Sequence, residues 1–108
     1  MNADESRLEP TRAEIDALET PVVIEFGTSW CSHCMAAQPL ITSAMGHHPR
    51  LSHIKIEDGP GRPLGRSFRV KLWPTLIFMQ RGKEIKRLVR PVDSSAIEQA
   101  LAQLDVTP

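Results

Sequence analysis

Two cysteines, Cys31 and Cys34, lie shortly after an apolar run at residues 22–26, and this succession limits the folds open to the chain. The run reads Val-Val-Ile-Glu-Phe, which is typical of a strand buried on both faces of a sheet. From residue 31 to about residue 45, helix-forming residues dominate. The sequence therefore predicts a central strand followed by a helix that carries both cysteines in its first turn.

Periodicity and turn residues predict the remaining elements. Thr11 and Glu14 have the spacing of a capping box, which begins a helix. Pro39 lies inside the central helix, where we expect a kink, and Gly46 is predicted to cap that helix. The full order is a helix at about 11–19, a strand at 22–26, a helix at 31–45, a strand at 51–57, a loop and short helix ending at Phe68, strands at 75–80 and 84–89 joined as a hairpin, and a final helix.

This order predicts an α/β fold, with a mixed central sheet of four to five strands flanked by helices on both faces. The final helix, capped by Asp93 or Ser94, carries one apolar stripe. The stripe consists of Ile97, Ala100, Leu101 and Leu104. At 108 residues the chain suits one domain. We expect that domain to span residues 1–108, with residues 1–7 as a flexible N-terminal tail.

Charge and hydropathy narrow the surroundings in which the chain works. The formal net charge is zero, which gives no general attraction to nucleic acid or to an acidic membrane surface. The acidic N-terminus has no apolar stretch that would resemble a signal peptide, and no run reaches the length of a membrane span. We therefore expect a soluble, cytoplasmic monomer.

The cysteine spacing points to chemistry rather than to structural support. A disulfide between Cys31 and Cys34 would close a very small loop and so would stabilise the fold only weakly. A zinc site would need two further ligands, and the four histidines, which include His33 and His53, have no zinc-ligand spacing. A CXXC pair between a strand and a helix favours redox chemistry, without a metal or a bound cofactor.

The start of a helix suits a reactive sulfur. Unpaired N–H groups and the positive end of the helix dipole stabilise an anion, so a thiolate at Cys31 is favoured. One helical turn brings the two sulfurs within bonding range. Cys31 is the candidate nucleophile and the expected exposed member, and Cys34 would resolve the mixed disulfide.

The chain resembles the thioredoxin family from about residue 8 to residue 104. The strongest motif is Trp30-Cys31-Ser32-His33-Cys34 followed by Pro39, which is similar to the family's kinked active-site helix. Trp73-Pro74-Thr75, placed before a strand, is similar to its cis-proline loop, and Gly82 fits its hairpin glycine. The resemblance implies the thioredoxin fold.

The resemblance also implies roles for individual residues. Cys31 would attack substrate disulfides and Cys34 would expel the reduced product. Pro74, if cis, would lie against the sulfurs, and the peptide groups of Trp73 would pair with an extended substrate segment. Trp30 and His33 would adjoin the bound substrate.

Glu25 stands where the family commonly has an aspartate that accepts the proton of the resolving thiol. Glu25 is one methylene longer, so it would act through a water molecule. The alternative is a carboxylate that reaches the surface at a strand end. Lys55 occupies the position of a family lysine that pairs with that carboxylate, the alternative being a plain surface lysine.

Three features depart from the family pattern. Ser32 and His33 replace the usual Gly-Pro between the cysteines. A cationic His33 would stabilise the reduced dithiol, and this would make the disulfide form of the protein a better oxidant than in ordinary thioredoxins. Trp73 is larger than the aliphatic residue usual before the cis-proline. Arg90 and Pro91 stand where a glycine is usual on the docking surface.

Basic residues also flank the predicted docking loop, where they would steer acidic substrates or form a solvated charged face. They are Arg62, Arg66, Arg69 and Lys71.

We therefore expect a dithiol–disulfide oxidoreductase that acts on disulfide-containing proteins. Its electrons would come from a flavoprotein similar to thioredoxin reductase or from a thiol pool. Two alternatives remain open, namely a more oxidising disulfide oxidase or isomerase, and a binding or adaptor module that uses Trp73 and the basic face.

Overall fold

A computed structural model of the chain describes residues 9–104, and the expected N-terminal tail at residues 1–7 lies outside them. The elements follow in the predicted order. They are α2 (Arg12–Asp16), β1 (Val22–Gly27), α3 (Ser32–Gly46), β2 (Ser52–Glu57), α4 (Pro63–Ser67), β3 (Thr75–Gln80), β4 (Lys83–Val89) and α5 (Ser94–Leu104).

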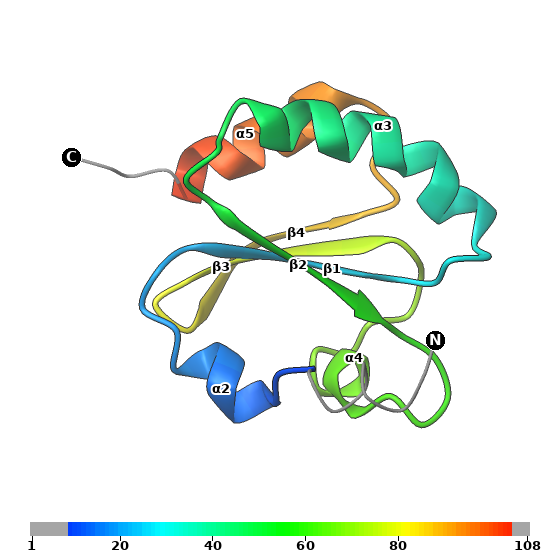
Figure 1. Cartoon of the computed structure of the whole chain (residues 1–108), viewed down its shortest axis with the longest axis vertical. Coiled ribbons are helices and arrows are strands. Elements are labelled where there is room, and N and C mark those ends of the chain that lie inside the picture. Colours follow the sequence, from blue (N-terminus) through cyan, green and yellow to red (C-terminus); the bar gives the residue numbers. More distant parts are fainter. Residues whose placement is uncertain (1–8, 105–108) are drawn as a thin grey trace.

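Four strands form one mixed sheet in the order β2-β1-β3-β4 (Figure 1). β1 is parallel to β2 and antiparallel to β3, and β3 is antiparallel to β4. The central position of β1 explains its apolar sequence, since both of its faces are covered. The fold is therefore the predicted α/β arrangement with four strands.

Helices cover both faces of the sheet, as Figure 1 shows. α3 and α5 lie on one face, where the predicted stripe of α5 is buried against Val23, Leu76 and Phe78. On the other face, Ile15 of α2 and Leu64 of α4 join a core built on β1 and β3. Alternate residues of β1 supply the two cores, because successive side chains point to opposite faces.

The ends of two helices differ from the prediction, and one of the two predicted caps of α5 is confirmed. α2 ends at Asp16 rather than near residue 19, because the N–H of Leu18 bonds back to the carbonyl of Ile15 and tightens the last turn. Gly46 is the last residue of α3, and His47 is its C-cap. Asp93 caps α5, since its carboxylate accepts the N–H of Ala96 at 3.0 Å.

The capping box of Thr11 and Glu14 is confirmed, with both side chains bonded to backbone N–H groups. The hairpin between β3 and β4 is also confirmed. Arg81 and Gly82 form its turn with φ of 53° and 75°, the pair of positive angles that a two-residue turn of type I′ requires. A Cβ on Gly82 would lie 2.2 Å from the carbonyl oxygen of Asp16, so the turn packs directly against α2.

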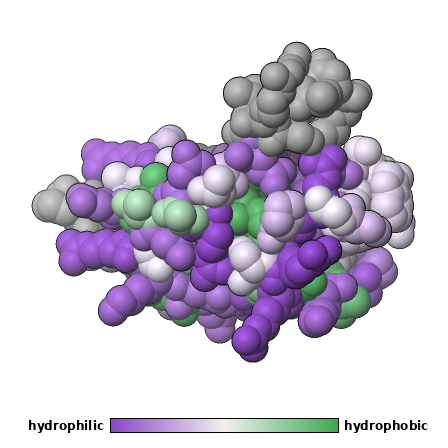
Figure 2. All heavy atoms as spheres, turned by 90° about the horizontal axis from the view of Figure 1, so that it is seen from below, coloured by the Kyte–Doolittle hydropathy of each residue, from purple (hydrophilic) through white to green (hydrophobic). Residues whose placement is uncertain are grey.

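The surface on the side of α2 and α4 is mainly hydrophilic, with small apolar patches between charged side chains (Figure 2). In the described part of the chain, no helix has the length and apolar content needed to cross a membrane.

Candidate functional site

The two cysteines lie at the start of α3 and are free thiols. Cys31 is the N-cap residue, and its Sγ accepts a hydrogen bond from the backbone N–H of Cys34 at 3.1 Å. Cys31 was expected to be exposed, but it is 7% exposed, close to the 5% of Cys34. The reason is that its sulfur turns back over the first helical turn instead of pointing outward. The predicted placement of both thiols in one turn is confirmed.

Cys34 is packed against the end of β1. A Cβ on Gly27 would lie only 2.6 Å from the Sγ of Cys34, so only a glycine leaves room for the sulfur here. Burial raises the pKa of Cys34 to about 11, and the hydrogen bond with Cys31 and the nearby charge of Glu25 act in the same direction. Cys34 is therefore protonated at neutral pH and needs a base before it can attack.

Glu25 is a buried carboxylate on the same face of the sheet as α3. It is 4% exposed, which excludes the alternative of a carboxylate reaching the surface. Its Oε2 accepts a hydrogen bond from Nε2 of Gln38 at 2.6 Å, and its Oε1 lies 2.8 Å from Nε2 of His53. Both carboxylate oxygens are thus satisfied, as burial of a charge requires.

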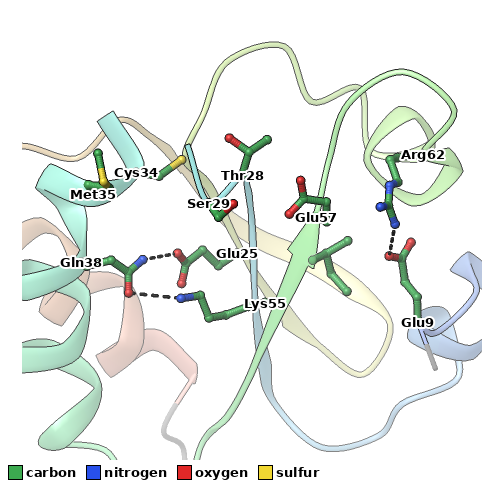
Figure 3. Close-up of a pocket in the computed structure, with 12 residues that line it drawn as sticks. Glu9, Glu25, Thr28, Ser29, Cys34, Met35, Gln38, Lys55, Glu57 and Arg62 are labelled. Carbon is green, nitrogen blue, oxygen red and sulfur yellow. Dashed lines mark hydrogen bonds and ion pairs between the residues drawn. The ribbon is translucent and has the colours of Figure 1, made fainter. Parts of the chain in front are cut away.

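The resemblance implied that Lys55 pairs with Glu25. In the structure the two groups are joined through Gln38 rather than by a direct ion pair, while the charge of Lys55 still lowers the pKa of Glu25. The two residues are register partners in β1 and β2, but the Nζ of Lys55 donates to Oε1 of Gln38 at 3.3 Å. Figure 3 shows the Gln38 amide bonded to both the Glu25 carboxylate and the Lys55 ammonium group. Lys55 lies on the edge strand β2, and the amide from α3 links it to the buried carboxylate.

His53 is the direct partner of Glu25, and the sequence analysis assigned it no such role. Because side chains alternate along a strand, His53 shares a face with Lys55 two positions further on. This shared face was the one feature of the sequence from which a contact between His53 and Glu25 could have been predicted. The side chain of His53 is 24% exposed, so the pair connects a buried carboxylate with solvent.

Opposing effects set the ionisation of Glu25. Burial alone would raise its pKa, but the hydrogen bond and charge of His53, the charge of Lys55 and the amide of Gln38 together hold the pKa below its ordinary value. Glu25 is therefore ionised at neutral pH and able to accept a proton.

Glu25 and Cys34 open into one pocket of about 540 Å³. Gly27, Gln38 and Lys55 line it together with residues from the loop after β1 and from β2 (Figure 3). A single water molecule occupies roughly 30 Å³ of liquid, so the pocket has room for several between the carboxylate and the thiol. A proton can therefore pass between them through solvent.

Trp73 and Pro74 approach the same end of β1. The Trp73–Pro74 peptide bond is cis. Phe26 of β1 pairs with Thr75 of the antiparallel strand β3, so Pro74, which directly precedes Thr75, lies next to the end of β1. At that end Gly27 contacts Cys34. The ring of Trp73 meets that of Trp30 edge-on, with centroids 5.6 Å apart. The two predicted motifs are therefore in contact through their tryptophans.

The indole N–H and the backbone carbonyl of Trp73 both form hydrogen bonds with neighbouring side chains. Its indole N–H donates to Oδ2 of Asp58 at 2.8 Å, and its carbonyl accepts from Nε of Arg90 at 2.8 Å. The backbone N–H of Arg90 also donates to the carbonyl of Pro74 at 2.9 Å. The Arg90 guanidinium thus occupies one of the two lone pairs of the Trp73 carbonyl, and a substrate strand that pairs with Trp73 would meet it there.

His33 lies exposed in the first turn of α3, immediately before Cys34. Trp30 is 70% exposed beside it. The dithiol is thus bordered by an aromatic ring and an imidazole that a docked substrate would meet.

Comparisons with known proteins agree with this geometry. A family model described as Thioredoxin matches residues 7–103. The structure of thioredoxin 2 from Pseudomonas aeruginosa in its reduced form is 52% identical, covers 89% of each chain and superposes with a TM-score of 0.80. Thioredoxin-1 of Saccharomyces cerevisiae is 28% identical over 95 residues, which are 85% of this chain and 91% of its own.

Other relatives are longer than this chain. A bifunctional thioredoxin reductase/thioredoxin from Mycobacterium leprae is 28% identical over 97 residues, which are 89% of this chain and 21% of that protein. The chain spans 21% to 59% of the length of three curated plant relatives.

Proposed function

This chain belongs to the thioredoxin family, and from that premise we propose that it is a thiol–disulfide oxidoreductase that reduces protein disulfides. One observation carries the proposal. The Sγ of Cys31 and the backbone N–H of Cys34 are joined in the first turn of α3, and an N–H donor directed at a sulfur favours its thiolate.

The reaction proceeds in two exchanges. The Cys31 thiolate attacks one sulfur of the substrate disulfide, which forms a mixed disulfide and releases the first substrate thiolate. Cys34 then loses its proton and attacks the Sγ of Cys31, which releases the second substrate thiolate. The substrate gains two electrons, and the protein is left with a disulfide between Cys31 and Cys34.

Glu25 is the base for the second exchange. With a pKa of about 11, roughly one Cys34 thiol in ten thousand is ionised at pH 7, so a proton acceptor speeds the attack. Glu25 takes the proton through water in the pocket that both residues line. His53 holds the carboxylate in place and passes the proton on to solvent, which its partial exposure supports.

The substrate docks beside Trp30, Trp73 and Pro74 as an extended segment. The contact between the two indole rings supports this site, since it holds the docking loop next to the dithiol. His33 contacts the substrate from the helix side.

A dithiol donor must regenerate the protein. The fusion of a thioredoxin reductase with a thioredoxin in the Mycobacterium leprae relative supports a flavoprotein reductase as that donor, with a small-thiol pool as the other source. A reducing compartment, the cytoplasm, suits a chain whose two cysteines form one exchangeable pair. We place the protein there as a monomer.

Reduction of insulin by dithiothreitol, followed as turbidity, tests the proposal. The wild-type protein should accelerate it, Cys31→Ser should abolish the acceleration, and Cys34→Ser should accumulate a mixed disulfide visible by mass spectrometry. Full activity of Cys31→Ser would overturn the mechanism. A wild-type protein that binds insulin without accelerating its reduction would identify an adaptor instead.

A second candidate function is disulfide oxidation or isomerisation. The position of His33 in the first turn of α3 favours it, because a cation there stabilises the reduced dithiol and makes the disulfide a stronger oxidant. The redox potential of the pair separates the two directions.

A further inference from the structure

A second pocket, of about 510 Å³, has Trp73 in its wall, and the ring of Trp73 also contacts that of Trp30 beside the cysteines. Four cationic side chains and one carboxylate line it. The cations are Arg62, Arg66, Arg69 and Lys71, and the carboxylate is Asp58. Trp73 itself forms part of the wall, so the pocket adjoins the proposed docking loop.

The single carboxylate of this pocket is already engaged. Asp58 accepts the indole N–H of Trp73 and packs so closely over α4 that a Cβ on Gly65 would lie 2.0 Å from its Oδ1. Arg62 lies 3.8 Å from the carboxylate of Glu9. Arg66, Arg69 and Lys71 are exposed at the rim, where they give the pocket a positive potential.

The backbone at Arg69 is fixed by the end of α4. Its φ is 58°, a left-handed angle at which glycine or asparagine is usual and an arginine is uncommon. Its N–H donates to the carbonyl of Arg66, and the N–H of Val70 donates to that of Gly65, both at 3.0 Å. These bonds hold the Arg69 side chain beside the pocket at some conformational cost.

We propose that this pocket binds an acidic segment of the protein substrate, next to the disulfide that Cys31 attacks. The proposal rests on the proposed oxidoreductase function and names its substrate class. The neighbouring pocket around Glu25 is less favourable for such a segment, because its three carboxylates, Glu9, Glu25 and Glu57, outnumber its two cations, Lys55 and Arg62. The difference in charge between the two pockets therefore directs the acidic segment of a bound substrate toward the basic pocket.

Two peptides with one disulfide each, identical except for Glu or Gln on both sides of the cystine, test this proposal. At low ionic strength the wild-type protein should reduce the Glu peptide with a kcat/KM about tenfold higher, and added salt should shrink the difference. In Arg66→Gln/Arg69→Gly/Lys71→Gln, kcat/KM for the Glu peptide should fall to that for the Gln peptide. Glycine suits the left-handed angle at position 69.

The matched control is Arg81→Gly/Lys83→Gln/Lys86→Gln, which removes three charges at and near the β3–β4 turn, including another arginine at positive φ. It should keep the preference for the Glu peptide. Equal rates for the two peptides with the wild-type protein, or loss of the preference in both variants, would overturn the proposal. A wild-type protein that reduces neither peptide would instead contradict the proposed function.

Direct binding gives a second measurement that does not depend on the folding of the triple variant. A cysteine-free Glu peptide should change the tryptophan fluorescence of the wild-type protein, and the Gln peptide should not. Single Lys71→Gln should weaken the Glu peptide's binding about threefold. Equal binding of the two peptides would also overturn the proposal.

Discussion

The ring of Trp30 meets the ring of Trp73 edge-on, with centroids 5.6 Å apart and planes at 83°. Trp30 directly precedes Cys31, and Trp73 directly precedes Pro74, so this contact joins the reactive thiols to the docking loop. Asp58 and Arg90 hold Trp73 through its indole N–H and its carbonyl. One side chain therefore sets the position of the loop relative to the sulfurs.

Replacement of Trp73 should slow the reduction of protein disulfides more than the reduction of small disulfides. Trp73→Phe keeps a ring but loses the bond to Asp58, and Trp73→Leu loses both contacts. We expect kcat/KM for insulin to fall about fivefold and about thirtyfold respectively, from a hydrogen bond worth about 1 kcal/mol and a ring pair worth about 1 kcal/mol. Exchange with a small aromatic disulfide is the control, and an equal fall there would contradict a docking role.

Glu25→Gln should slow the step in which Cys34 resolves the mixed disulfide. At pH 7 we expect a loss of about a hundredfold, the usual effect of a general base. The loss should shrink as the pH rises toward the pKa of Cys34, about 11, since the thiolate then forms without a base. Single-turnover kinetics from pH 6 to pH 10 measure this. A constant ratio between variant and wild type across that range would exclude the role as a base.

The same substitution should change the acid stability of the fold. The pKa of Glu25 is lower in the folded protein than its ordinary value of 4.5, so its stabilising contribution is present at neutral pH and is lost as the pH falls below that value. The urea midpoint of the wild-type protein should therefore decrease more steeply below pH 4.5 than that of Glu25→Gln. Parallel curves would contradict this, because the other acidic groups are common to both proteins.

Gly27→Ala should disturb the thiol site directly. The new methyl group would lie 2.6 Å from the Sγ of Cys34, and we expect a cost of about 1–3 kcal/mol in the free energy of unfolding together with slower resolution. Gly46→Ala is the matched control. A Cβ there meets nothing within 4 Å, and the substitution should stabilise the helix by about 0.5–1 kcal/mol. Denaturant unfolding compares the two, and equal effects would show that Gly27 has no steric role.

His33→Pro should lower the redox potential of the dithiol. An exposed cation beside a thiolate contributes about 0.2–1 kcal/mol, which corresponds to about 5–20 mV for a two-electron couple. Equilibration with glutathione buffers measures the shift. His33→Gln removes the charge without adding a proline and should give most of it; an unchanged potential in both variants would remove the basis for the oxidase alternative.

Several relationships at the site could be read only in part from the sequence. Glu25 was a candidate because it interrupts an apolar strand at residues 22–26 and stands where the family commonly has an aspartate. The resemblance to the family assigned Lys55 as the partner of that carboxylate, and the two residues are register partners in the sheet. The actual partners, His53 and Gln38, come from a diagonal position on β2 and from the second turn of α3. Their choice depends on side-chain lengths and on the spacing between helix and sheet.

Local patterns in the sequence determined the elements, their order, the capping box at Thr11 and the position of the cysteines in the first turn of a helix. These features depend on neighbours a few residues apart, so the chain specifies them without knowledge of the fold. The tertiary structure alone decided that Trp73 meets Trp30, that Arg90 binds the carbonyl of Trp73 and that Gly27 makes room for Cys34. Each of these joins segments distant in the chain, and their distances are set only when the helices pack on the sheet.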